Sequence, residues 1–158
     1  MSRDDVIRKL DQLIEACQDG EDGYYVAAQG VHHTQLKAML EWCSSQRGEF
    51  AEQLAELVAV LGGTLEIGAS PANILYCRWD KIKSASRTGN MAAIVRECER
   101  GDAKAMQAYD EVLAYDLPEP VRKLIAWQYD KIKFSHQRLN RLNLPPMNEA
   151  NMTVSMDY

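Results

Sequence analysis

The sequence contains no run of apolar residues that approaches the roughly 18 needed to cross a membrane as a helix. Its first residues, MSRDD, are charged and lead into no apolar core of a secretion signal. Both absences remove the usual signs of insertion or export, so we expect a cytoplasmic protein with no membrane partner. The 158 residues suffice for one domain with a sizeable buried core.

Paired-cysteine motifs are also missing. The four cysteines stand singly, separated by 26, 34 and 21 positions: Cys17, Cys43, Cys77 and Cys98. Because no Cys-x-x-Cys pair is present, zinc chelation and thiol exchange at such a motif are excluded. A four-helix bundle can store copper on cysteines at helical spacing, but here each helical segment supplies only one. We interpret them as small buried side chains and expect the thiols to be reduced.

Motifs of the common enzyme classes are absent as well. The sequence has no nucleophile arrangement, no glycine-rich phosphate loop and no zinc-ligand spacing. Its formal net charge of −5 supplies no overall positive field to replace the counterions of nucleic-acid phosphates. We therefore expect no nucleic-acid partner and no cofactor, and enzymatic activity has no positive support in the sequence.

What the sequence does have is helical periodicity, with apolar residues recurring at spacings of three and four. This pattern predicts four long helices, over residues 3–30, 34–61, 90–115 and about 121–142. A capping box at Ser2 and Asp5 starts the first helix, and it continues through its two glycines because the apolar phase is kept across them. Thr34 and Asn90 are the expected caps of the second and third helices.

The connections between these helices predict the topology. Short links force helices one and two, and helices three and four, to be antiparallel, whereas roughly 27 residues between two and three allow the chain to cross the whole bundle. Ser70-Pro71 predicts a short crossover helix in that connection. We expect one all-α domain over residues 1–142, an up-down-down-up four-helix bundle with this additional helix. Residues 143–158 are polar and predict a flexible or partner-contacting tail.

Each long helix carries one polar residue in its apolar stripe, near the middle: Glu21, Arg47, Asp102 and Gln128. A buried charge without a partner costs several kcal/mol, so ionic residues on inward phases are expected to pair with one another. The sequence therefore predicts a buried polar layer in which Arg47 is flanked by Glu21 and Asp102, with the Gln128 amide completing the hydrogen bonds. The alternative is a phase error, which would leave part of this layer on the solvated surface.

Several segments carry a family resemblance. They are residues 13–20 (LIEACQDG), 46–51 (QRGEFA), 61–63 (LGG) and 97–101 (ECERG), followed by Leu117-Pro118 leading to Gln128-Tyr129 and His136. Together they resemble the bacterial four-helix-bundle proteins of the ferritin-like superfamily that form a domain of unknown function. The resemblance covers about residues 7–142. It implies a ferritin-like fold, often dimeric, with no established activity and no catalytic residue to carry over.

The chain departs from the metal-binding members of that superfamily. A di-iron site takes a carboxylate from each of two helices and a Glu-x-x-His pair from each of the other two, and no Glu-x-x-His occurs here. Where the rubrerythrin pattern would have that pair, helix two has Gln46 and Glu49, and helix four has Gln128 and Lys131. The alternative, a divergent iron or manganese protein or oxidase, would draw its ligands from the acidic residues Glu21, Glu49, Glu97 and Glu99.

Two further features bear on the role of the chain. His136 lies one position off the stripe of helix four, and we expect it at the bundle edge, hydrogen-bonded to a carboxylate rather than acting as a catalyst or ligand. Apolar and aromatic residues outside the stripes, including Trp42, Trp127 and Tyr129, exceed what one small bundle readily buries. We therefore expect a protein that acts by association, as a homodimer or with a protein partner.

Overall fold

The computed structural model describes residues 1–63 and 80–142 of the chain. Every regular element in these residues is a helix, which confirms the all-α prediction: α1 (Arg3–Gln29), α2 (Thr34–Val60), α4 (Asp80–Arg87), α5 (Met91–Leu113) and α6 (Glu119–Arg141). The predicted start of the crossover helix at Ser70-Pro71, Cys77 and the predicted tail at 143–158 lie outside the described residues. None of the described helices combines the length and apolar content needed to cross a bilayer.

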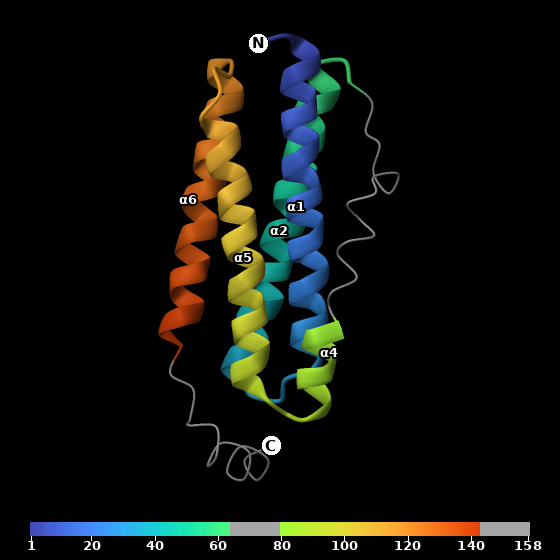
Figure 1. The fold of residues 1–158 in the computed structure, drawn as a ribbon, viewed down its shortest axis with the longest axis vertical. Helices are drawn as coiled ribbons and strands as arrows, with labels where there is room; N and C mark the ends of the chain where they lie inside the picture. Colours follow the sequence, from blue (N-terminus) through green and yellow to red (C-terminus); the bar gives the residue numbers. More distant parts are fainter. Residues whose placement is uncertain (64–79, 143–158) are drawn as a thin grey trace.

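Figure 1 shows the four long helices side by side along one direction. α1 runs down the page, α2 returns upward beside it, α5 also runs upward, and α6 descends beside α5. α2 ends at the end of the bundle where α1 begins, whereas α4 and α5 begin at the opposite end (Figure 1). α2 and α5 are consequently parallel.

The helix ends follow from local hydrogen bonding. Ser2 accepts the backbone N–H of Asp5 at 3.1 Å, and Asp5 accepts the backbone N–H of Ser2 at 3.3 Å, which is the predicted capping box. Asn90 caps α5 by accepting from the N–H of Ala93 at 3.0 Å, also as predicted. The predicted cap of α2 was wrong, because Thr34 is already helical and the Nδ1 atom of His33 accepts from Leu36 at 3.1 Å instead.

The buried core falls into two clusters along the bundle. One contains Leu10, Leu13, Leu54 and Ile125, and the other contains Ala27, Leu36, Leu40, Ile94 and Leu139. Between them lie the polar side chains of Arg47, Asp102 and Ser135, all buried. Cys17, Cys43 and Cys98 are free and buried, which confirms the interpretation of these three cysteines as small core side chains. The bundle thus has an apolar core divided by a polar band.

Candidate functional site

The polar band consists of side chains that point inward from the middle of three helices. Arg47 of α2 and Asp102 of α5 are each only 1% exposed, and Ser135 of α6 is fully buried. The Nη1 atom of Arg47 donates to Asp102 Oδ1 at 2.8 Å, so the two charges form an ion pair in the interior of the bundle. Burial of an arginine at this depth requires such a partner, because an isolated charge there would lose its hydration without compensation.

The remaining donors of the guanidinium are also used. Nη2 of Arg47 donates to the hydroxyl of Ser135 at 3.2 Å, and Nε donates to Gln46 Oε1 at 3.3 Å. Ser135 lies within 3.2 Å of the same Gln46 oxygen and donates to the carbonyl of Ile132 at 2.9 Å. The guanidinium carbon lies 5.3 Å from the centre of the Tyr24 ring, within cation–π range.

Asp102 is the acceptor at the centre of the cluster. Its Oδ2 atom accepts the hydroxyl proton of Tyr24 at 2.5 Å and lies 3.0 Å from Nδ1 of His136. Because a carboxylate can only accept, His136 carries its proton on Nδ1 in this arrangement. Nε2 of the same ring lies 3.3 Å from the Asn140 amide. His136 therefore occupies the bundle edge beside a carboxylate, as predicted, with its side chain 19% exposed.

Electrostatics favour the charged form of this network. Burial alone would raise the pKa of Asp102, but the Arg47 guanidinium and the hydrogen bonds from His136, Tyr24 and Arg47 together hold that pKa below its usual value. The hydrogen bond to Asp102 raises the pKa of His136 above its ordinary value, against the opposing effect of burial. Asp102 is thus an anion that binds one buried cation and one titratable group near the surface.

Gln128 belongs to a second set of hydrogen bonds. It is fully buried, and its Oε1 atom accepts from the hydroxyl of Tyr109 at 2.7 Å. Its amide nitrogen donates to Gln53 at 2.9 Å and to the carbonyl of Phe50 at 3.3 Å. The Tyr109 oxygen also lies 3.1 Å from the sulfur of Cys17. The predicted single layer is therefore two groups, since these bonds join Gln128 to Tyr109 and not to Arg47.

The predicted place of Glu21 beside Arg47 needs correction. Glu21 is only partly buried, and Gly20 lies against the Arg47 side chain instead, since a Cβ atom on Gly20 would lie 3.2 Å from Arg47 Cγ. The Glu21 carboxylate instead lies over Gly48, where an added Cβ would stand 2.3 Å from its oxygen. Tyr24, one helical turn further along α1, points inward instead, and its hydroxyl group donates a hydrogen bond to Asp102.

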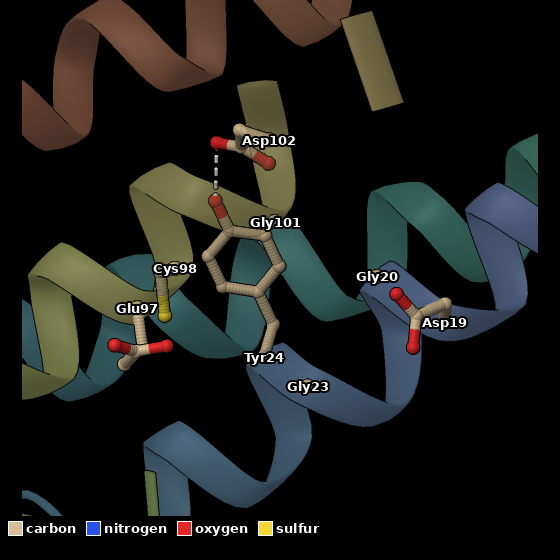
Figure 2. Close-up of a pocket in the computed structure, with 8 residues that line it drawn as sticks. All are labelled: Asp19, Gly20, Gly23, Tyr24, Glu97, Cys98, Gly101 and Asp102. Carbon is tan, nitrogen blue, oxygen red and sulfur yellow. Dashed lines mark hydrogen bonds between the residues drawn. The ribbon is translucent and has the colours of Figure 1, made fainter. Parts of the chain in front are cut away.

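A small pocket lies beside the cluster, between α1 and α5. Its cavity volume is only about 10 Å³, roughly the space of a single water molecule, and it is partly open to solvent. Its lining consists of Asp19, Gly20, Gly23, Tyr24, Glu97, Cys98, Gly101 and Asp102. Figure 2 shows the Tyr24 side chain reaching from α1 to Asp102 of α5 across this space.

Asp19 is the group of this pocket whose hydrogen bonding is incomplete. Its Oδ1 atom is buried without a hydrogen-bond partner. Burial, with a smaller contribution from the charge of Asp22, raises the pKa of Asp19 to about 7, while Lys104 acts in the opposite direction. The carboxyl group is therefore close to half protonated at neutral pH.

The residues of the alternative metal site do not come together. Glu49 is exposed on α2, and Glu97 lies 3.6 Å from Arg100 on its own helix. Glu21 lies over Gly48, and Glu99 is partly buried on α5. Across residues 1–63 and 80–142, no three histidine, cysteine or acidic side chains are grouped closely enough to hold a metal ion.

The three described thiols are poor nucleophiles. Burial raises the pKa of Cys17 to about 11 and that of Cys43 to about 12, and it raises the pKa of Cys98 well above its ordinary value. Since the thiolate is the reactive form, these side chains stay protonated and inert at neutral pH. The cluster as a whole is a closed set of satisfied hydrogen bonds, with His136 as its exposed member.

Sequence reasoning missed three members of this cluster: Tyr24, Gln46 and Ser135. Tyr24 shares the apolar phase of Cys17 and Ala28, so the sequence indicated that it points inward but not that its hydroxyl reaches α5. Gln46 precedes Arg47 and lies off the inward-facing apolar positions of α2. Nothing in the sequence pattern predicts the hydrogen bond between its side chain and Ser135.

Comparison with known protein families gives a match over most of the chain. No curated protein matches the chain. The family model described as Domain of unknown function (DUF2383) matches residues 5–115, from the first turn of α1 to just beyond α5. The matched region contains Tyr24, Arg47 and Asp102, while Ser135 and His136 lie beyond it. Because the match spans well over half of the sequence, the chain belongs to the family Domain of unknown function (DUF2383).

Proposed function

We propose that the protein is a ferritin-like helical bundle that acts in the cytoplasm by association, with itself or with another protein, rather than by catalysis. The observation that carries this proposal is the closed cluster around Arg47 and Asp102 at the middle of the bundle. It fills the region between the long helices with groups that already satisfy one another. The parallel course of α2 and α5 supports the ferritin-like arrangement (Figure 1).

The residues present do not fit the di-metal site that a ferritin-like fold implies. Such a site gathers carboxylates and histidines from four helices around two cations. Here the guanidinium of Arg47 lies among α2, α5 and α6, and Asp102 is already its counter-ion. A fixed positive charge 4 Å from a bound cation opposes binding by about 4 kcal/mol per unit charge at an effective dielectric constant of 20. We therefore propose that Arg47 takes the place of the metal.

A cytoplasmic location is supported by the cysteines. Cys17, Cys43 and Cys98 are free, whereas proteins of oxidising compartments commonly pair their cysteines.

The test is the metal content of the full-length protein, purified without added metal and measured by plasma mass spectrometry. We expect iron and manganese far below one ion per chain. We also expect ferrous iron to leave the thermal midpoint unchanged, because a ligand that does not bind the native state cannot stabilise it. Two iron or manganese ions per chain would overturn the proposal in favour of a divergent metal protein or oxidase. Glu21→Gln and Glu97→Gln would then show whether the acidic residues bind them.

A further inference from the structure

One side of the bundle, formed by α2 and α6, exposes a concentration of aromatic and apolar side chains. Trp42 is 43% exposed, Val60 81%, Trp127 47% and Phe134 51%. These are four of the seven large apolar side chains that are exposed within the described residues. Exposed apolar surface gathered on one side, rather than scattered singly, is typical of an interaction site.

The contacts of the three aromatic side chains place them along the seam between α2 and α6. The Arg138 guanidinium lies 5.9 Å from the Trp42 ring centre and 5.8 Å from that of Phe134. The Trp127 ring packs edge-on against Phe50 of α2, with 5.6 Å between ring centres, and the Lys131 ammonium lies 5.6 Å from the Trp127 ring. We call this surface the α2/α6 face: Trp42, Glu49, Glu56 and Val60 of α2 with Trp127, Lys131, Phe134 and Arg138 of α6.

The two helices contribute opposite charges to the α2/α6 face. On α2, Glu49 and Glu56 follow Trp42 at intervals of seven, which keeps them on the same side of the helix, and both are exposed. On α6, Lys131 and Arg138 are likewise seven apart and exposed. α6 as a whole carries six Lys and Arg but only two Asp and Glu, although the net charge of the chain is −5.

The hydrogen bonds between α2 and α6 fix which residues stand at the same height. Gln46 lies beside Ser135 at 3.2 Å, and Gln53 accepts from Gln128 at 2.9 Å. Because α2 and α6 are antiparallel (Figure 1), Glu49 lies at the height of Lys131, and Trp42 lies at the height of Arg138.

We propose that a second copy of the chain covers the α2/α6 face, with the two-fold axis parallel to the helices. This inference rests on the proposed function of association and specifies its surface and its partner. A two-fold axis of this kind keeps every residue at its height and places α2 of one protomer against α6 of its partner. Glu49 then faces the partner's Lys131, and Trp42 faces the partner's Arg138. The exposed rings are then covered by the partner's face, next to these ion pairs.

The other symmetric arrangement brings like charges together. A two-fold axis perpendicular to the helices would set α2 against α2 and α6 against α6. The acidic side of α2 would then face the partner's α2, and the basic side of α6 would face the partner's α6. Glu49 and Glu56 would therefore not pair with the partner's Lys131 and the partner's Arg138, which disfavours association. Charge complementarity therefore selects the axis parallel to the helices.

Sedimentation velocity of the full-length chain, at concentrations around tens of micromolar, tests the proposal. We expect a dimer for the wild type. Glu49→Lys and Lys131→Glu each turn two attractive pairs per dimer into repulsive ones, and each should weaken self-association about tenfold or more. An equimolar mixture of these two variants should dimerise again. In the mixed dimer, Lys at 49 of one variant faces Glu at 131 of the other, and the second pair is the native Glu49 with the native Lys131, so both pairs are attractive.

The matched controls are Glu111→Lys and Lys104→Glu, which make the same charge changes on exposed positions of α5, away from the face. We expect them to leave the dimer intact, and circular dichroism should show every variant folded. A wild type that is monomeric, or a dimer that both single reversals leave unchanged, would overturn the proposed interface. A metal-free monomer would still leave the proposed metal-free bundle standing. A dimer containing two metal ions per chain would instead overturn the proposed function and leave the interface standing.

Discussion

At the residue scale, the cluster shows how a charge is kept inside a small bundle. Arg47 donates to Asp102, Ser135 and Gln46, so each of its three nitrogens has an acceptor. A buried ion pair adds little net stability compared with apolar residues of similar size, but loss of one partner is costly because the other charge stays buried. We therefore expect the cluster to specify the relative positions of α2, α5 and α6, while it contributes little net free energy of unfolding.

We expect Arg47→Met and Asp102→Asn to be strongly non-additive. Each single change leaves an uncompensated buried group and should reduce the free energy of unfolding by about 3 kcal/mol or more. The double change removes both charges and should recover much of that loss. Urea unfolding of the four proteins measures the coupling. Glu21→Gln serves as the control, with an effect within about 0.5 kcal/mol because this side chain is not a partner of Arg47. Additive losses would show that the two residues are not coupled.

Asp19 gives a prediction about pH. Its pKa is raised from 3.8 to about 7 in the folded protein. As the pH rises, the unfolded chain therefore loses this proton at a lower pH than the folded protein does. Stability is therefore lost as the pH rises from about 4 to about 7. We expect Asp19→Asn to stabilise the protein at pH 7 by about 1 kcal/mol, a value reduced for its partial exposure, and to have little effect near pH 4. Unfolding curves at both pH values test this expectation. Equal effects at pH 4 and pH 7 would contradict the raised pKa.

At the element scale, the helices were largely predictable from sequence, and the contacts between them were not. Spacings of three and four, the Ser2 capping box and the Asn90 cap are local signals, and the helices begin where these signals place them. The position of Glu21 depends instead on how closely α1 approaches α2. That approach is set by glycines on both helices, Gly20 against Arg47 and Gly48 against Glu21. The apolar pattern of a single helix contains no information about the distance between two helices. The sequence therefore could not show that Tyr24, and not Glu21, reaches the buried cluster.

The glycines within the helices should respond differently to alanine. Alanine is favoured over glycine in a helix interior by about 1 kcal/mol. A Cβ atom on Gly101 of α5 would meet nothing within 4 Å, so Gly101→Ala should raise the free energy of unfolding by about that amount. A Cβ atom on Gly20 would stand 3.2 Å from Arg47 Cγ, so the Arg47 side chain would have to shift by a few tenths of an ångström within its hydrogen-bonded cluster. Gly20→Ala should therefore be less stable than Gly101→Ala in parallel thermal melts. The opposite order would mean that Arg47 does not depend on the gap at Gly20.

At the scale of the whole molecule, the bundle balances a well-filled interior against an unusual exterior. Its two apolar clusters pack on either side of the polar band, and the buried side chains there leave few groups unsatisfied within the described residues. The α2/α6 face, in contrast, leaves three aromatic rings about half exposed. Because the core is already filled by other side chains, we attribute the exposure of these rings to the proposed contact with a second protomer.

Self-association through that face should make the stability of the fold depend on protein concentration. Dimerisation binds only the native state, so raising the concentration from about 2 to about 200 μM should raise the thermal midpoint of the wild type by about 4 °C. Phe134→Ala removes a ring that is 51% exposed and should abolish most of this dependence with little change in the midpoint at low concentration. Tyr25→Ala removes a ring of similar size that is 60% exposed on α1, away from the face, and should keep the full dependence. A wild-type midpoint that does not move with concentration would contradict dimerisation, and equal responses of the two variants would place the contact elsewhere on the bundle.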